Sequence, residues 1–255
     1  MLRSVNNLVN CGIEATDSKV GKVSEFYFDD EKWTVRYLVV DTGGWLTDRK
    51  VLISPAALGD VDWNSRKLHV EMTRERVQNS PDIDTDKPVS RQHEKQYDDY
   101  YGYPYYWGGP SLWGPVAFPI YPPPYRENAS SSIQGEIAAA ERQQDDVHLR
   151  STREVTDYHI DASDGEIGHV EDFLIDDESW TIRYIVVDTR NWWPGKKVLI
   201  SPEWIEDLNW TDSTAHVDLS RDVIKNSPEY DESAINRDYE KRLHEHYGRS
   251  EYWDH

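Results

Sequence analysis

Two pairs of neighbouring acids are the first residues in this 255-residue chain whose types and spacing could do chemistry. Asp29 and Asp30 recur as Asp176 and Asp177, and paired carboxylates can act as general acid and base or bind calcium. Both pairs follow an apolar β-forming stretch, where acids in a hairpin turn are solvated, and the runs lack the glycine-punctuated spacing of a calcium loop. We therefore interpret them as turn residues without a catalytic or metal-binding role.

The histidines near the end of the chain, His244, His246 and His255, are the other candidates for metal binding. Positions 244 and 246 would not share a helix face, so we predict no metal site there. The sequence has no nucleophile elbow, no glycine-rich phosphate loop and no cysteine–histidine pairing, and Cys11 is its single cysteine. We therefore expect a protein that is not an enzyme and that binds no cofactor.

Three tryptophans in predicted loops are candidates for binding rather than for catalysis. Trp45, Trp192 and Trp193 stand in corresponding loops of two similar parts of the chain. Loop tryptophans can anchor a protein partner or stack on a sugar ring, and they can also cap the end of a barrel. We therefore treat all three as candidate protein-contact residues; the alternative, that they cap the barrel ends or the interface between the two copies, stays open.

The charge of the chain limits its partners. A formal net charge of −20 repels nucleic acid phosphates and anionic lipid headgroups. No window approaches the roughly 18 apolar residues of a membrane span, and the first residues lack the apolar core of a secretory signal. We expect a cytoplasmic protein that binds a protein partner but neither binds nucleic acid nor inserts into a membrane. Peripheral association with a membrane complex stays open.

An internal repeat supplies the elements that must position these residues. A shift of about 147 positions aligns residues 2–84 with residues 149–231 without a gap, and 36 of the 83 positions are identical. Such agreement indicates two copies of one fold. The first copy has 11 basic and 14 acidic residues and the second has 8 and 19, so we expect different outward surfaces and distinct partners.

Within each copy the pattern is that of short β-strands. β-Forming residues between turn signals predict strands at 20–28, 34–41, 51–53 and 68–70, with counterparts at 167–175, 181–188, 198–200 and 216–217. Thr73 and Ser220 are candidate N-caps of short helices that end near Asn79 and Asn226.

A repeated acid and base suggest an ion pair at the rim of each fold. Arg36 and Asp41 in the first copy correspond to Arg183 and Asp188 in the second. We predict that each pair joins neighbouring strands.

The assembled motifs resemble the PRC-barrel family, known from the cytoplasmic domain of the photosynthetic reaction-centre H subunit and from ribosome maturation factors of the RimM type. The resemblance is carried by a turn-Val-Gly-x-Val-x-acid-Phe stretch, an Arg-Tyr-x-Val-Val strand and a Val-Leu-Ile-Ser-Pro strand. These motifs lie at 17–26, 36–40 and 51–55, and with small changes at 164–173, 183–187 and 198–202. The resemblance implies a mainly β fold of small barrels used for protein contacts, with no common catalytic site.

The repeat and the resemblance together divide the chain into four parts. We assign residues 1–84 and 149–231 to two tandem barrels, which we expect to pack on each other. Residues 85–148 are assigned to a helix, an irregular stretch rich in Tyr, Trp, Pro and Gly from 97 to 125, and a connecting helix at 130–146. Residues 232–255 are assigned to a helix and a second aromatic tail, in which Arg237, Glu240, Tyr252 and Trp253 follow the order of Arg91, Glu94, Tyr106 and Trp107.

The aromatic stretch also bears on function. A solvated aromatic tract of this size would be sticky, so we expect it to lie along a barrel groove or to bind a partner. The leading interpretation of the chain is a non-enzymatic interaction or scaffold protein built on two barrels. Two alternatives stay open: an accessory factor of a photosynthetic reaction-centre or electron-transfer complex, and a carbohydrate-binding or hydrolytic protein that uses aromatics and carboxylates.

Overall fold

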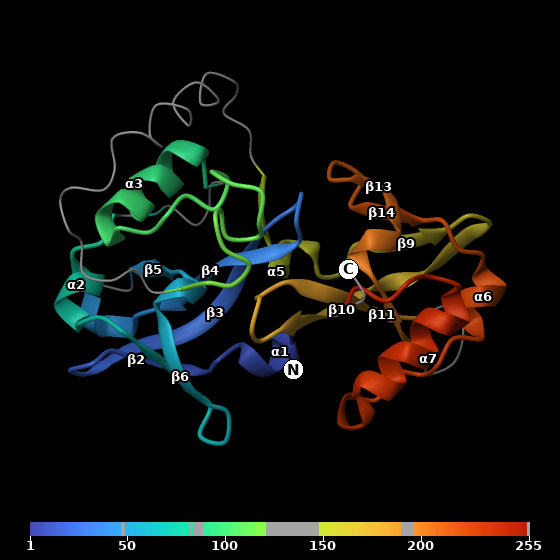
Figure 1. The fold of residues 1–255 in the computed structure, drawn as a ribbon, viewed down its shortest axis with the longest axis horizontal. Helices are drawn as coiled ribbons and strands as arrows, with labels where there is room; N and C mark the ends of the chain where they lie inside the picture. Colours follow the sequence, from blue (N-terminus) through green and yellow to red (C-terminus); the bar gives the residue numbers. More distant parts are fainter. Residues whose placement is uncertain (47–48, 82, 84–88, 121–147, 190–195, 254–255) are drawn as a thin grey trace. The chain divides into compact units, whose positions relative to one another are not determined.

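The computed structural model describes residues 1–46, 49–81, 83, 89–120, 148–189 and 196–253 (Figure 1). These residues form two compact units. The first unit comprises Leu8–Ser151 and Glu178–Thr181, and the second comprises Met1–Asn7, Thr152–Asp177 and Ile182–His255. The predicted connecting helix at 130–146 lies outside the described residues, as do Trp192 and Trp193.

The first unit contains a seven-stranded sheet. Its strands are β2 (Gly12–Glu14), β3 (Lys19–Asp29), β4 (Thr34–Asp41), β5 (Lys50–Ile53), β6 (Leu58–Asp62), β7 (Lys67–Val70) and β8 (Leu149–Ser151). They are arranged in the order β5-β4-β3-β2-β7-β6, with β8 beside β3. β2 and β7 pair in parallel, whereas the other neighbours are antiparallel.

The second unit repeats this topology. Its strands are β1 (Leu2–Ser4), β9 (His159–Ala162), β10 (Gly165–Asp176), β11 (Ile182–Asp188), β12 (Lys197–Ile200), β13 (Ile205–Asn209) and β14 (Thr214–Val217). The order is β12-β11-β10-β9-β14-β13, with β1 beside β10, and β9 and β14 are parallel. The mainly β fold in two copies, predicted from the repeat, is confirmed.

Short helices complete each unit. They are α1 (Val5–Leu8), α2 (Arg74–Gln78), α3 (Arg91–Tyr101), α5 (Thr152–Val155), α6 (Arg221–Lys225) and α7 (Arg237–Tyr247), together with the single turns η1 (Gly43–Leu46), η2 (Pro55–Ala57), η3 (Pro202–Trp204) and η4 (Glu232–Ala234). The side chains of Thr73 and Ser220 accept hydrogen bonds from the first turns of α2 and α6. The two predicted N-caps are therefore confirmed.

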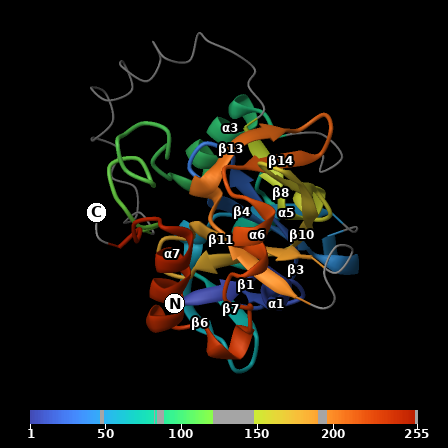
Figure 2. The same cartoon turned by 90° about the vertical axis from the view of Figure 1, so that its right-hand side faces the viewer.

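The boundaries of the compact units differ from those of the sequence copies, because the copies exchange one strand. β1 comes from the first copy but pairs with β10 of the second unit (Figure 2). β8 comes from the second copy but pairs with β3 of the first unit. The assignment of residues 1–84 and 149–231 to separate barrels misses this exchange, since both exchanged strands read Leu-Arg-Ser and their sequence does not say which sheet they join.

A close approach of backbones explains the glycine in the repeated Val-Gly or Ile-Gly motif. A Cβ added at Gly21 would lie 2.1 Å from the carbonyl oxygen of Asp41, and one added at Gly168 would lie 2.1 Å from that of Asp188. Any side chain would collide with the neighbouring strand at these points. The β3–β4 and β10–β11 contacts therefore require glycine.

Apolar residues on both faces of these long strands are buried. Ile13, Phe26, Phe28 and Leu38 are buried in the first unit, and Ile160, Phe173, Ile185 and Val187 are buried in the second. Burial of apolar area is the main stabilising contribution for such small sheets.

Candidate functional site

The described part of the aromatic stretch, residues 97–120, packs against the sheet of the first unit. Its first residues are helical, because α3 continues to Tyr101, inside the stretch predicted to be irregular, and ends at Gly102 with φ of 77°. Tyr97 on α3 fixes the helix to the sheet: its hydroxyl donates to the Leu52 carbonyl at 3.0 Å and accepts from the Ser54 amide at 3.1 Å. Of the two expected roles, packing along the fold is confirmed for Tyr97, Tyr101, Tyr103, Tyr106 and Trp113, which are all buried.

Arg36 on β4 connects the sheet to this aromatic segment. Its Nε lies 2.6 Å from Asp29 Oδ2, and its Nη1 donates to the Leu112 carbonyl at 2.7 Å. The guanidinium carbon lies 3.8 Å from the ring centroid of Tyr106 and 4.9 Å from that of Trp113. A buried charge thus has an ion-pair partner and two aromatic faces, which lowers the cost of its desolvation.

The predicted pairing of Arg36 with Asp41 is wrong. Asp41 instead accepts a hydrogen bond from the Gly43 amide at 2.8 Å. Five residues along one strand place Arg36 and Asp41 on opposite faces, whereas the hairpin between β3 and β4 returns Arg36 to Asp29. In the second unit, Arg183 likewise lies 3.8 Å from Asp176.

The same contact corrects the interpretation of the acidic turns. Asp29 is 3 % exposed and is not a solvated turn residue. Its neighbour Asp30 binds Arg150 Nε at 2.9 Å, and the corresponding Asp177 binds Arg3 Nε at 3.0 Å. Each acidic pair therefore binds one arginine on the next strand and one that is distant in sequence. The local pattern does not indicate the distant partner.

A buried carboxylate on α3 organises the other side of the segment. Glu94 is fully buried and accepts a hydrogen bond from the Tyr106 hydroxyl at 2.7 Å. Arg91 Nη1 lies 3.0 Å from Glu94 Oε2, and His148 Nε2 lies 3.1 Å from the same oxygen. The charge of Glu94 is therefore balanced by Arg91, and its carboxylate oxygens accept hydrogen bonds within the fold. The carboxylate is not free to act on a ligand.

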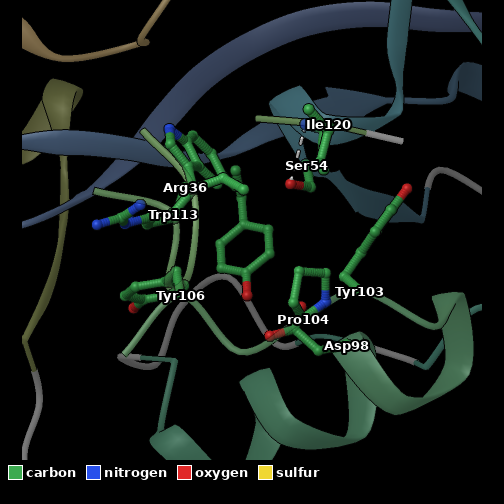
Figure 3. Close-up of a pocket in the computed structure, with 11 residues that line it drawn as sticks. Arg36, Ser54, Asp98, Tyr103, Pro104, Tyr106, Trp113 and Ile120 are labelled. Carbon is green, nitrogen blue, oxygen red and sulfur yellow. Dashed lines mark hydrogen bonds between the residues drawn. The ribbon is translucent and has the colours of Figure 1, made fainter. Parts of the chain in front are cut away.

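A small cavity of about 20 Å³ remains between the sheet, α3 and the aromatic segment (Figure 3). Arg36 reaches it from the sheet and Asp98 from α3, and Tyr37 and Ser54 also line it. This volume accommodates about one or two water molecules. Arg36 Nη2, Tyr37 Oη and Asp98 Oδ2 are buried there without a hydrogen bond of normal geometry, although Tyr37 is close enough to Asp98 to act on its pKa.

The electrostatics of the pocket favour a neutral acid. Burial raises the pKa of Asp98 well above its usual value, and the nearby charges of Glu94 and Asp99 raise it further. A protonated carboxyl can donate as well as accept a hydrogen bond. Tyr37 and, where its carboxyl is protonated, Asp98 can therefore donate into this small space, which Arg36 also lines.

The second unit fills the corresponding space. Ala57 of the first copy is replaced by Trp204, whose ring centroid lies 5.3 Å from that of His244 and 4.8 Å from that of Tyr247. His244 takes the place of Asp98, and its ring nitrogens lie 2.8 Å from Tyr184 Oη and 2.8 Å from the Ser250 carbonyl. This region is therefore packed with aromatic rings, and both ring nitrogens of His244 have hydrogen-bond partners.

The echo between the two aromatic tails is confirmed by their contacts. Tyr252 Oη donates to Glu240 at 2.8 Å, as Tyr106 does to Glu94. Arg237 lies 3.1 Å from Glu240, and its guanidinium carbon lies 4.1 Å from the Trp253 ring centroid. Both tails thus use one arginine–glutamate–tyrosine arrangement to cover their sheet.

A family model described as the PRC-barrel domain matches residues 2–77 and 160–224. The chain belongs to the PRC-barrel family. Both matched ranges end before α3 and α7, so each PRC barrel is covered by a helix and aromatic tail from outside the match. The pocket accordingly lies between the first PRC barrel and this added cover. No curated protein matches the chain.

Of the three tryptophans that the sequence offers as contact candidates, Trp45 lies in the described part of the structure. Trp45 lies on η1, where its Nε1 donates to the Val20 carbonyl at 2.6 Å and the Arg74 guanidinium carbon lies 3.7 Å from its ring centroid. It is partly exposed. Because Trp192 and Trp193 lie outside the described residues, the contact role of the three tryptophans stays a prediction.

The described residues include two of the three histidines that the sequence offers as metal-binding candidates. They contain no group of three or more His, Cys, Asp and Glu side chains that could hold a metal ion. His244 is buried, His246 Nε2 lies 2.8 Å from the Val223 carbonyl, and His255 lies outside the described part. No helix in these same ranges has the length and apolar character needed to cross a membrane.

Sequence reasoning missed the pocket residues of the first PRC barrel. Arg36 and Tyr37 stand in the repeated Arg-Tyr motif, from which the sequence predicts a strand and an ion pair of Arg36 but no pocket. Asp98 is distinguished by a difference between copies, since the aligned residue of the second tail is His244. A comparison of the two tails residue by residue was the signal that could have identified it.

Proposed function

We propose that this chain is a non-enzymatic interaction protein, and that the aromatic segment on its first PRC barrel contacts a protein partner. The observation that carries the proposal is the exposure of Phe118 and Ile120, each 51 % exposed at the outer end of a segment that otherwise packs on the barrel. Large apolar side chains that remain exposed beside one another are typical of protein-contact surfaces.

The position of these residues distinguishes them from scattered surface apolar groups. Ile120 and Val116 line the pocket together with the buried Tyr106 and Trp113, so the exposed apolar surface adjoins a buried aromatic cluster. Residues 108–120 also lie beyond the part of the segment that the second tail repeats. A rigid, aromatic support under an exposed apolar patch lowers the ordering cost of binding.

The buried polar groups support a role without catalysis. Arg36 is held by Asp29, and Glu94 is held by Arg91 and Tyr106. The cavity of about 20 Å³ accepts water molecules rather than a substrate. These groups thus serve to attach the aromatic segment to the barrel.

The charge difference between copies supports separate partners. The first copy has a net charge of −3 and the second of −11. A partner that docks on Phe118 and Ile120 therefore meets a nearly neutral barrel, whereas the second barrel favours basic surfaces.

A pull-down with variants of the full chain tests the proposal. The wild-type chain is cross-linked to proteins of a lysate from its own source, and the captured partner is quantified by mass spectrometry. For the double variant Phe118→Ser/Ile120→Ser, we expect the amount of captured partner to fall by about tenfold or more, as is typical when central contact residues are removed. Val223→Ser on α6 is the matched control, because Val223 is 36 % exposed in the second unit.

The sequence-based contact residues are tested in the same assay. Trp45→Ala and the double variant Trp192→Ala/Trp193→Ala show whether the tryptophan loops contribute to the same partner. Unchanged capture by Phe118→Ser/Ile120→Ser would contradict the proposal. Specific binding of the purified chain to a glycan array, lost in the tryptophan variants, would favour the carbohydrate-binding alternative instead.

A further inference from the structure

The slot on β10 that receives β1 has the features of a recognition site for a short strand. The backbone of β1 pairs with β10 in the register Leu2↔Asp176, Arg3↔Ile175 and Ser4↔Leu174. Two side chains add specificity: Arg3 Nε lies 3.0 Å from Asp177 Oδ2, and Ser4 Oγ donates to Asp172 Oδ2 at 2.5 Å. Main-chain bonds thus supply affinity, and the two acids select an arginine and a serine.

The first unit contains the same slot with the same contacts. β8 pairs with β3 in the equivalent register, from Leu149↔Asp29 to Ser151↔Tyr27. Arg150 Nε lies 2.9 Å from Asp30 Oδ2, and Ser151 donates to Glu25. The main-chain bond before each strand is also repeated, since the amides of Asp177 and Asp30 donate to the carbonyls of Met1 and His148 at 3.0 Å.

The two strands are interchangeable in sequence. Leu2–Ser4 and Leu149–Ser151 both read Leu-Arg-Ser, so neither slot can distinguish them by its side-chain contacts. In both units the slot is nevertheless filled by the strand of the other copy. Each copy is therefore built to accept its Leu-Arg-Ser strand from outside itself.

We propose that the β10 slot also accepts this strand from a second molecule of the chain. Residues 1–4 of one molecule then occupy the slot of another, and reciprocal exchange gives a strand-exchanged dimer. The high effective concentration within one chain favours its own strand, so the exchanged form gains as the own strand is weakened or as the protein concentration rises. This inference is independent of the partner proposed for the aromatic segment.

Charge complementarity identifies the strand as the occupant. The slot presents Asp172, Asp176 and Asp177, and the strand brings Arg3. Asp177 is 14 % exposed and Arg3 is 28 % exposed, so their ion pair is partly desolvated and its reversal is costly. A substitution that reverses the charge at position 3 is therefore compensated only by one that reverses the charge at position 177, and the converse also holds.

This relation gives a complementation experiment with two full-length variants. Arg3→Asp places two acids together within its own chain, and Asp177→Arg places two arginines together. When the two proteins are refolded together, each strand finds its complement only in the other molecule. We expect the mixture to form a 1:1 dimer by native mass spectrometry and light scattering, while each variant alone stays largely monomeric.

The matched control carries both substitutions in one chain. Arg3→Asp/Asp177→Arg restores the pair within the molecule and is expected to show no more dimer than the wild type. Circular dichroism verifies that each variant is folded. The mixture and the single variants are measured at the same protein concentrations. If both variants are folded and their mixture contains no heterodimer, the proposal is overturned.

A peptide assay tests the same recognition without the Asp177→Arg variant. The labelled peptide Met-Leu-Arg-Ser-Val-Asn-Asn, which copies residues 1–7, is titrated into the full-length Arg3→Asp protein and into the wild type. We expect at least about tenfold tighter binding to Arg3→Asp, whose own strand is weakened, and loss of binding when the peptide arginine is replaced by aspartate. Recognition by the slot would be contradicted if the arginine and aspartate peptides bound equally well. It would also be contradicted if the arginine peptide bound equally well to Arg3→Asp and to the wild type.

Discussion

Arg36 and Asp29 form an ion pair that water hardly reaches: Nε lies 2.6 Å from Oδ2, and the side chains are 0 % and 4 % exposed. The pair joins β4 to the end of β3 and supports the rings of Tyr106 and Trp113. One interaction thus connects the PRC barrel to the aromatic segment that covers it.

Removing one partner of this pair is expected to destabilise the chain strongly. Asp29→Ala leaves a buried guanidinium without its counter-charge, and we expect a loss of about 3–5 kcal/mol in the free energy of unfolding. Asp30→Ala, which removes the more exposed contact to Arg150, should cost about 1 kcal/mol or less. Urea unfolding followed by tryptophan fluorescence measures both. Similar costs for the two variants would show that Arg36 finds another partner.

The close approach at Gly21 predicts a difference between two glycines. Gly21→Ala forces a Cβ to within 2.1 Å of the Asp41 carbonyl oxygen, whereas a Cβ at Gly43 meets no atom within 4 Å. We expect Gly21→Ala to cost about 3 kcal/mol or more, as for severe overpacking. Gly43 has φ of 63°, so Gly43→Ala should cost only the left-handed backbone term of about 1–2 kcal/mol. Thermal unfolding of the two variants tests this order.

The buried Asp98 predicts a pH dependence of stability. Burial, followed by the charges of Glu94 and Asp99, raises its pKa in the folded state. The protonated carboxyl therefore stabilises the fold below the unfolded pKa of about 3.9, and this contribution is lost as the pH rises toward the folded pKa. Asp98→Asn mimics the neutral acid, so its Tm should exceed that of the wild type at pH 7 and approach it at pH 4.

The control for this prediction is the exposed neighbour Asp99. The other groups facing Asp98 are Arg91, Tyr37 and Glu94, which are kept in both variants. Asp99→Asn should change Tm little and with a weak pH dependence. A constant Tm difference between Asp98→Asn and wild type from pH 4 to pH 8 would show that Asp98 is not neutral in the fold.

The hydroxyl of Tyr106 is expected to hold the aromatic segment in place. Tyr106→Phe removes its hydrogen bond to Glu94, a buried charged acceptor, and should cost about 1–3 kcal/mol. Hydrogen exchange should then accelerate in residues 102–120 more than in β3 or β4. Tyr252→Phe is the matched variant, because Tyr252 makes the same bond to Glu240. Faster exchange spread evenly over the first unit would contradict a local role.

Some of these features were predictable from local patterns. The two copies, the strands around Val20–Phe28 and Thr34–Asp41, and the caps at Thr73 and Ser220 follow from alternation, turn residues and the repeat. They depend on interactions between residues near in sequence, which the order of residue types records directly.

Tertiary structure alone decided which distant groups meet. Nothing in the sequence separates the strand Leu2–Ser4 from Leu149–Ser151, so their exchange between sheets could not be inferred from it. Similarly, Arg36 has several acids near it in the sequence, and only the β3–β4 hairpin brings Asp29 to it. The burial of Asp98 depends on how α3 lies over the sheet. Strand edges pair through main-chain groups that every residue shares, and for this reason the repeat alone determined two similar folds without determining which strand completes each one.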